Sequence, residues 1–118
     1  MTVLVKKSAK FLDSGVVNML EAMIEDYAMF MTPDTEIKKN MNKKFSDGFV
    51  EKIGSKYIKI ISNDSVTAFI VKTDNDKKFK KGDILYPAGW AAPARNKARG
   101  NVLDGNYPIQ WTGPLYLR

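Results

Sequence analysis

Apolar residues recur at helical spacing in the first third of the chain. Intervals of three and four residues put such side chains on one face of an α-helix, and Asp13 or Ser14 can cap its first turn. The pattern predicts a helix over 14–30 whose methionines fill a core. The apolar face consists of Val16, Leu20, Met23, Ile24, Tyr27 and Met31. Three acids lie off this face and are expected in solvent, namely Glu21, Glu25 and Asp26.

A second helix is predicted after a break at Thr32. Thr32 can cap its N-terminus, Pro33 suits the first helical position, and Gly48 can end it. Its apolar residues recur every four positions, and lysines occupy much of the remaining surface. The apolar positions are Ile37, Met41 and Phe45. We therefore expect two helices joined by a short corner, with the lysines on a solvated face.

After Gly48 the apolar spacing changes to two, which is typical of β-strands. Gly54-Ser55 fits a two-residue hairpin loop, and 63–65 predicts a second turn. Alternation on the third strand puts Ala68 and Ile70 on one face, with Lys72 as a further candidate for it. The predicted strands are 49–53, 56–61, 66–72, 84–85, 102–103 and 109–111, with 115–117 as a final edge.

These elements predict an α+β fold, with residues 1–118 as a single domain. The helical part is 1–48, and the β part is 49–118 with a long connection at 86–101. Two N-terminal helices thus precede an antiparallel sheet of about six short strands. The pattern leaves two shapes open: a flat sheet, or a small open barrel of SH3-like or OB-like form.

The stretch 79–106, FKKGDILYPAGWAAPARNKARGNVLDGN, differs from the rest of the chain in composition. It holds four of the eight glycines and all but one of the arginines. Pro93 predicts the start of a short helix that runs through Ala98 and ends at Gly100. Such a helix would present two arginines and a lysine beside Trp90. Because binding residues are often carried by loops on a rigid scaffold, this stretch is the candidate binding surface.

The net charge of +6 arises after Val50. Residues 1–50 carry seven basic and seven acidic side chains, whereas 51–118 carry twelve basic and six acidic ones. A local excess of this kind favours a partner of negative charge, although solubility alone can account for a charge of this size. The candidate binding residues are Arg95, Lys97, Arg99, Trp90, Lys80, Lys81 and Tyr86.

The alternative is that the same stretch is a well-packed structural connection. Asp83 and Asp104 can then brace it through ion pairs with its arginines. In this interpretation Trp90 anchors the connection, and Trp111, inside the strand-like run IQWTG, is mostly buried. The residues assigned a structural role are Gly82, Asp83, Asp104 and Trp111.

The chain lacks the usual residues of catalysis. It contains no His and no Cys, which removes the commonest general base, the commonest metal ligand and all thiolate chemistry. It has no phosphate-binding glycine loop and no dinucleotide motif. Asp74 and Asp76 begin like a calcium loop but lack the glycine and the distal Glu that such a loop needs. We therefore expect a non-enzymatic protein with no metal and no cofactor.

The C-terminal half carries a string of short motifs: GDIL, a Trp, APA, ARGN, a DG turn and WTGP-x-YL. This string resembles small accessory proteins of tailed bacteriophages. The resemblance implies a phage origin and expression in the host cytoplasm. It implies no catalytic residue, and it does not extend to the helical half.

Two functions remain. The favoured one is a nucleic-acid-binding module, in which Lys and Arg neutralise phosphates and aromatic rings stack on bases. The alternative is a phage accessory factor that binds and modulates a host protein, in host takeover or anti-defence, since Tyr, Trp and Arg also dominate protein interfaces.

Membrane association is not expected. The chain has no run of about 18 apolar residues, and residues 1–11 are too short and too charged for a signal peptide. A cytoplasmic location is the expectation that follows. The sequence leaves the oligomeric state open.

Overall fold

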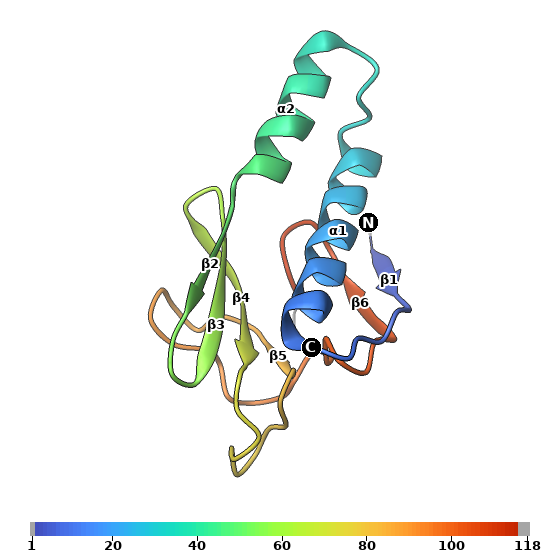
Figure 1. Ribbon diagram of the computed structural model, residues 1–118. Coiled ribbons are helices and arrows are strands. Elements are labelled where there is room, and N and C mark those ends of the chain that lie inside the picture. The colour runs from blue at the N-terminus through green and yellow to red at the C-terminus, as the bar shows by residue number, and fades with distance from the viewer. Residues whose placement is uncertain (1, 116–118) are drawn as a thin grey trace.

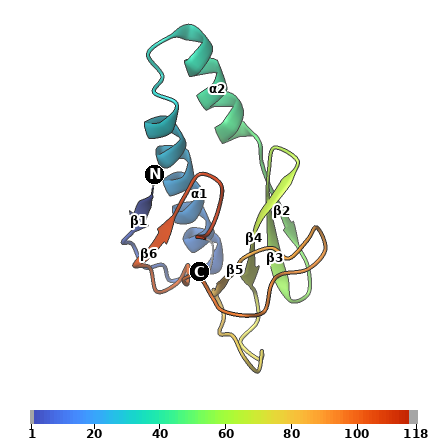
Figure 2. The same cartoon turned by 180° about the vertical axis from the view of Figure 1, so that it is seen from behind.

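The computed structural model describes residues 2–115. In chain order the elements are β1 (Val3–Val5), α1 (Leu12–Phe30), α2 (Glu36–Asp47), β2 (Phe49–Ile53), β3 (Tyr57–Ser62), β4 (Ser65–Val71), β5 (Ile84–Leu85) and β6 (Tyr107–Ile109). The strands β2, β3, β4 and β5 form one antiparallel sheet in that order, and β1 pairs with β6 in a second. Helix α1 lies between the two sheets (Figures 1 and 2).

This architecture confirms the α+β class and the antiparallel pairing. Residues 2–115 form no closed barrel, because β1 and β6 pair only with each other. The expected order is matched only in part: the β-prone run at the start of the chain forms β1, which precedes the helices and pairs with β6, so Val3 lies opposite Ile109. The chain therefore begins in a sheet whose other strand is supplied by its last quarter.

The two helices are close to their predicted bounds. Helix α1 begins two residues earlier than expected, at Leu12. Helix α2 is capped by Thr35 and not by Thr32, because the Thr35 hydroxyl accepts a hydrogen bond of 3.2 Å from the Lys38 backbone N–H. Such a bond satisfies one of the free donors in the first turn. The pair Thr32-Pro33 belongs to the connection between the helices.

The two hairpin loops differ from each other in geometry. Asn63 and Asp64 both have positive φ, 49° and 69°, and join Ser62 to Ser65, as expected for the tightest hairpin turns. The first loop lies one residue later than predicted. Because the Gly54 N–H donates to the Tyr57 carbonyl at 2.9 Å, its two central residues are 55 and 56.

Three predicted elements after β5 are absent or displaced. The chain over 93–98 is irregular and not helical. The strand expected at 102–103 is a turn. The chain pairs instead with β5 and the residues before it over 99–102: Arg99 N–H donates to Ile84 O at 2.8 Å, and Val102 N–H donates to Gly82 O at 2.9 Å. Strand β6 occupies 107–109 in place of 109–111. Residues 116 and 117 of the predicted final edge lie outside the described residues.

Strands β4 and β5 of the four-stranded sheet are buried on both faces. One face packs on α1, where Met19 and Met23 meet Ile60 and Ile70 with little or no exposure to solvent. The opposite face carries a smaller cluster of Phe69, Val71, Phe79 and Leu85. Ala68 and Ile70 share a face of β4, as alternation predicted, and both lie in the core beneath α1. Alternation did not predict the second core, because the side chains on both faces of β4 are buried.

The turn after β5 is held by a buried polar network centred on Asn101, which is 5% exposed. Its Nδ2 donates to the Asp83 carboxylate and to the Lys81 carbonyl, both at 2.9 Å. Its Oδ1 accepts from the backbone N–H groups of Leu103 and Asp104 at 2.8 and 3.1 Å. All polar groups of this side chain therefore have partners.

We predict that Asn101→Ala lowers the free energy of unfolding by about 2–3 kcal/mol, because buried groups lose their hydrogen-bond partners. Urea denaturation provides the measurement. Asn40→Ala, an exposed position on α2, is the matched control and should change stability by less than about 0.5 kcal/mol. Equal effects of the two substitutions would show that the network contributes nothing.

Candidate functional site

Trp90 lies at the tip of a tight loop that leaves the sheet after β5. Pro87 and Pro93 face each other across this loop, and the N–H groups of Ala88 and Gly89 both donate to Ala92 O, at 3.1 and 3.2 Å. The indole of Trp90 is 53% exposed. The loop thus presents a large aromatic ring to solvent on a hydrogen-bonded backbone.

Arg95 is held in a structural contact. Its guanidinium donates to Asp76 Oδ1 at 2.9 Å and to the Tyr57 hydroxyl at 2.5 Å, and it lies 5.0 Å from the centre of the Phe79 ring. The hydrogen bond from Arg95, together with bonds from the N–H groups of Lys78 and Phe79, holds the pKa of Asp76 well below its ordinary value. The hydrogen bond to Asp76 raises the pKa of Arg95.

Arg99 is also engaged within the chain. Its guanidinium lies 5.1 Å from the centre of the Tyr86 ring. It donates to Asn96 Oδ1 at 3.0 Å and to the Leu115 carbonyl at 3.2 Å. Both arginines therefore tie the connection to neighbouring segments, as the structural alternative expected.

The acids predicted to hold the arginines have other partners. Asp83 accepts from Asn101 and from the Lys80 backbone N–H. Asp104 pairs with the Lys80 ammonium, and this hydrogen bond raises the pKa of Lys80. The expected ion pairs from the arginines to Asp83 and Asp104 are thus wrong. Two predicted binding residues stay exposed with no ion pair to any acid in residues 2–115, namely Lys81 and Lys97.

A basic surface that sequence reasoning missed lies below Trp90. Lys52 on β2 and Lys59 on β3 are directly opposite each other in the sheet register. Their ammonium nitrogens lie 6.0 and 4.8 Å from the centre of the Trp90 ring. Neither lysine forms an ion pair with an acid of the described chain, 2–115.

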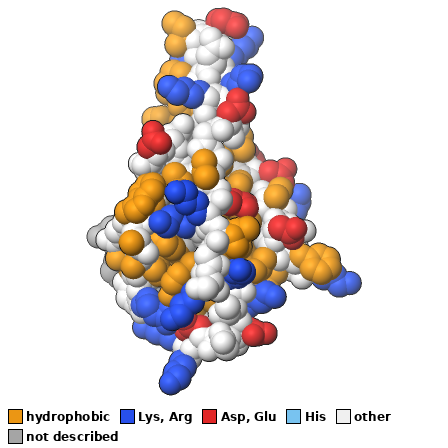
Figure 3. Space-filling model, turned by 60° about the vertical axis from the view of Figure 1, so that its left-hand side comes forward, with side chains coloured by type: hydrophobic (Ala, Val, Ile, Leu, Met, Phe, Trp, Pro, Cys, Tyr) orange, Lys and Arg blue, Asp and Glu red, His pale blue; other side chains and the backbone are white. Residues whose placement is uncertain are grey.

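The same surface extends along the hairpin of β2 and β3. A hollow of about 390 Å³ is lined by Lys52, Lys56 and Lys59 together with Ala91 of the Trp90 loop. Figure 3, turned to bring this side of the molecule forward, shows Lys and Arg side chains interspersed with hydrophobic ones over its lower part. We call Lys52, Lys56, Lys59 and Trp90 the Trp90 basic face.

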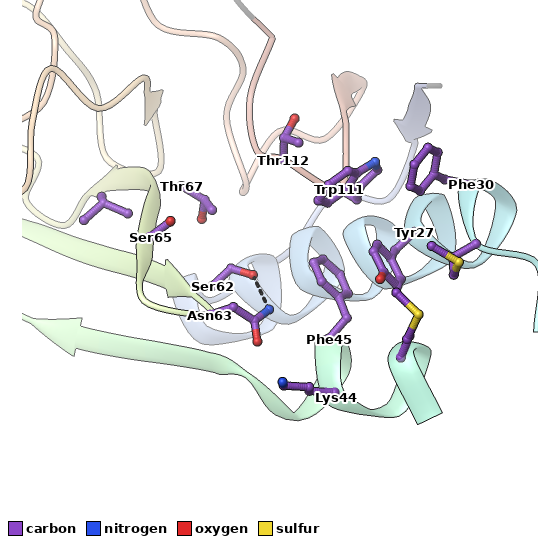
Figure 4. A pocket seen from close by; sticks show the side chains of 13 residues that line it. Tyr27, Phe30, Lys44, Phe45, Ser62, Asn63, Ser65, Thr67, Trp111 and Thr112 are labelled. Carbon is purple, nitrogen blue, oxygen red and sulfur yellow. Dashed lines mark hydrogen bonds between the residues drawn. The ribbon is translucent and has the colours of Figure 1, made fainter. Parts of the chain in front are cut away.

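A second hollow, of about 710 Å³, lies between the helices and the turn from β3 to β4. Figure 4 shows an aromatic wall on one side of it and a wall of small polar side chains on the other. The aromatic wall consists of Tyr27, Phe30, Phe45 and Trp111. The polar wall consists of Ser62, Asn63, Ser65, Thr67 and Thr112. We call this hollow the aromatic groove.

The rings of the groove are fixed by mutual contacts. Tyr27 stacks on Phe45 with centroids 4.3 Å apart, and Trp111 meets Tyr27 edge-on at 5.3 Å. Phe30 lies 5.4 Å from Trp111 in a stacked arrangement and is 57% exposed. One aromatic wall is therefore preformed, with Phe30 as its open end.

Trp111 is positioned by an acid that was expected in solvent. Asp26 is fully buried, and its Oδ2 accepts a 2.8 Å hydrogen bond from the Trp111 backbone N–H. Asp26 therefore connects α1 to the segment after β6. The Trp111 side chain is neither fully buried nor exposed, because one side of it lines the groove.

The remaining chemical options are few. Within residues 2–115 no three acidic side chains gather to hold a metal ion, and no helix there is long and apolar enough to cross a membrane. Comparison with protein-family models, curated proteins and solved structures finds no match. The resemblance to phage accessory proteins thus stays a prediction from the motif string.

The contact between Asp76 and Arg95 predicts a pH effect. Because the folded-state pKa of Asp76 lies below its ordinary value of 3.8, the contact stabilises the fold above pH 3.8 and is lost as the pH falls below it. Thermal melts should show a wild-type advantage over Asp76→Asn near neutral pH that shrinks below about pH 4. Asp74→Asn, in the same loop, is the control and should match the wild type throughout.

Arg95 and Lys97 have different roles in the connection, so their substitutions should differ in their effect on the thermal midpoint. Arg95→Ala should lower the thermal midpoint, because it removes three contacts, one with Tyr57 on β3 and two with the 76–79 loop. Lys97→Ala should leave the midpoint unchanged, since that side chain is exposed and unpaired among the described residues. Differential scanning calorimetry compares the two variants, and an unchanged midpoint in Arg95→Ala would argue against the brace.

Proposed function

We propose that this protein binds nucleic acid, without catalysis, through the Trp90 basic face. The observation that carries the proposal is the direct opposition of Lys52 and Lys59 on neighbouring strands beside the exposed Trp90. Like charges opposite each other destabilise a sheet. A phosphate placed between the two ammonium groups would remove that repulsion, and a strand of nucleic acid supplies phosphates in series.

Trp90 adds a second kind of contact to the same face. Its exposed ring can stack on a base, and base stacking on an aromatic side chain depends little on sequence. Ammonium groups bind phosphates and do not read base edges. We therefore propose binding with little sequence preference. A phage origin remains part of the proposal, on the motif string alone.

The second candidate function is binding to a host protein. It is supported by apolar side chains that project from the helical pair: Phe30, Ile37 and Met41 are 57%, 74% and 40% exposed. Exposed apolar side chains that lie together often mark protein interfaces. Nucleic acid is favoured because the Trp90 basic face combines unpaired charge with an aromatic ring.

The proposal predicts a change in salt dependence. Fluorescence anisotropy with a labelled single-stranded oligonucleotide should give an affinity that falls as salt rises. Lys52→Ala/Lys59→Ala should flatten the slope of log K against log salt by about 1.4 units, since each lost phosphate contact on a single strand contributes about 0.7. The thermal midpoints of the wild type and of this double variant are compared before the titration.

Lys6→Ala/Lys10→Ala provides the matched control. It removes the same charge from exposed positions on the β1 side of the molecule, away from β2 and β3 (Figures 1 and 2). Its slope should stay that of the wild type. No binding by the wild type at low salt would refute the nucleic-acid function, and equal slopes in the two double variants would place the site elsewhere.

A further inference from the structure

The aromatic groove has the composition of a site for a flat, polar ring. Its aromatic wall is preformed, and Phe30 and Trp111 lie at its open end. The opposite wall offers hydroxyl groups from Ser65 and Thr112, whereas the Thr67 hydroxyl already donates to the Ile60 carbonyl at 3.2 Å. A ligand seated there meets a stacking surface on one side and hydrogen-bond donors and acceptors on the other.

The charge of the groove selects among such ligands. Its lining includes one ionisable cation, Lys44, and no carboxylate. Lys44 forms no ion pair with any acid of residues 2–115. In a neighbouring hollow Lys43 is paired with Asp47 at 3.1 Å, so Lys44 is the unpaired cation among the described residues at this end of the groove. A flat ring that carries a phosphate therefore suits the groove better than a neutral or cationic one.

The groove is adjacent to the Trp90 loop. Ser65 and Val66 line the groove, and the same two residues line a separate hollow together with Trp90 and Tyr86. The start of β4 thus forms the boundary between the two surfaces. A chain bound at Trp90 has a direct path across this boundary into the groove.

We infer that the aromatic groove receives an unstacked base of single-stranded nucleic acid, with Lys44 at the adjoining phosphate. The inference rests on the proposed function and makes it more specific. A base in a duplex is paired and stacked on its neighbours, so its faces cannot reach Phe30 and Trp111. The protein then binds single strands in preference to duplexes, because only a single strand can place one base at Trp90 and another in the groove.

The two tryptophans allow each surface to be followed separately, because the chain contains no others. Trp90→Phe leaves Trp111 as the only indole, which reports on the groove. Trp111→Phe leaves Trp90, which reports on the basic face. Each variant is titrated with a single-stranded oligonucleotide, a duplex of equal length and a nucleoside monophosphate, while anisotropy of a labelled strand measures overall binding.

The single strand should quench Trp111 over the same concentration range in which anisotropy rises. The duplex should bind more weakly and leave Trp111 unquenched. Phe30→Ala should weaken single-strand binding at least about fivefold, as expected for loss of one stacked base, with an unchanged salt slope. Phe11→Ala, another exposed Phe on the chain at 65%, is the control and should retain wild-type affinity.

Other results would overturn the inference. If binding quenches the fluorescence of Trp90 but not that of Trp111, and Phe30→Ala keeps full affinity, then the Trp90 basic face is the whole site. Equal affinity of the monophosphate and the strand at Trp111 would assign the groove to free nucleotides. If the fluorescence spectrum of Trp111 shifts with protein concentration alone, the groove would be assigned to a second copy of the chain. Absence of any binding would refute the proposed function as well.

Discussion

The burial of β4 on both faces is the constraint on which the rest of the structure depends. Helix α1 covers one face of the four-stranded sheet, but no helix within residues 2–115 covers the other (Figure 1). There Phe69, Val71 and Leu85 are covered by Phe79, which precedes β5, and by Ala98 of the connection that follows it. The irregular connection must therefore lie against this face, and its turn-back places Trp90 over the neighbouring hairpin of β2 and β3.

In this arrangement the arginines and the lysines have different roles. A segment without regular structure has to be held by side chains, and the planar guanidinium of arginine makes several directed contacts at once. Arg95 and Arg99 perform this role and tie the connection to distant segments. The lysines of β2 and β3 have no such task. Their ammonium groups stay available beside Trp90, so the proposed binding surface is carried by the scaffold that the arginines stabilise.

Sequence reasoning predicted the elements with strong periodicity and missed what depends on register. The helices and β2 to β4 were found because their apolar spacing is regular. A loop centred on Gly54-Ser55 would place Lys59 opposite Val50, whereas the observed loop at 55–56 places it opposite Lys52. A shift of one residue in the loop thus creates the lysine pair. The buried role of Asp26 could not be predicted either, since its partner is 85 positions away.

The aromatic groove exists because α2 is only partly packed. Phe45 is the one buried residue of this 12-residue helix, and so short a helix gains little stability by itself. Two contacts hold it to α1: the stack of Phe45 on Tyr27 and a 2.7 Å hydrogen bond from Asn42 Nδ2 to the Met31 carbonyl. Phe45 also meets the Trp111 ring edge-on at 6.0 Å, so the residue that anchors α2 is part of the aromatic wall. The contacts that anchor the helix thus also build one wall of the groove.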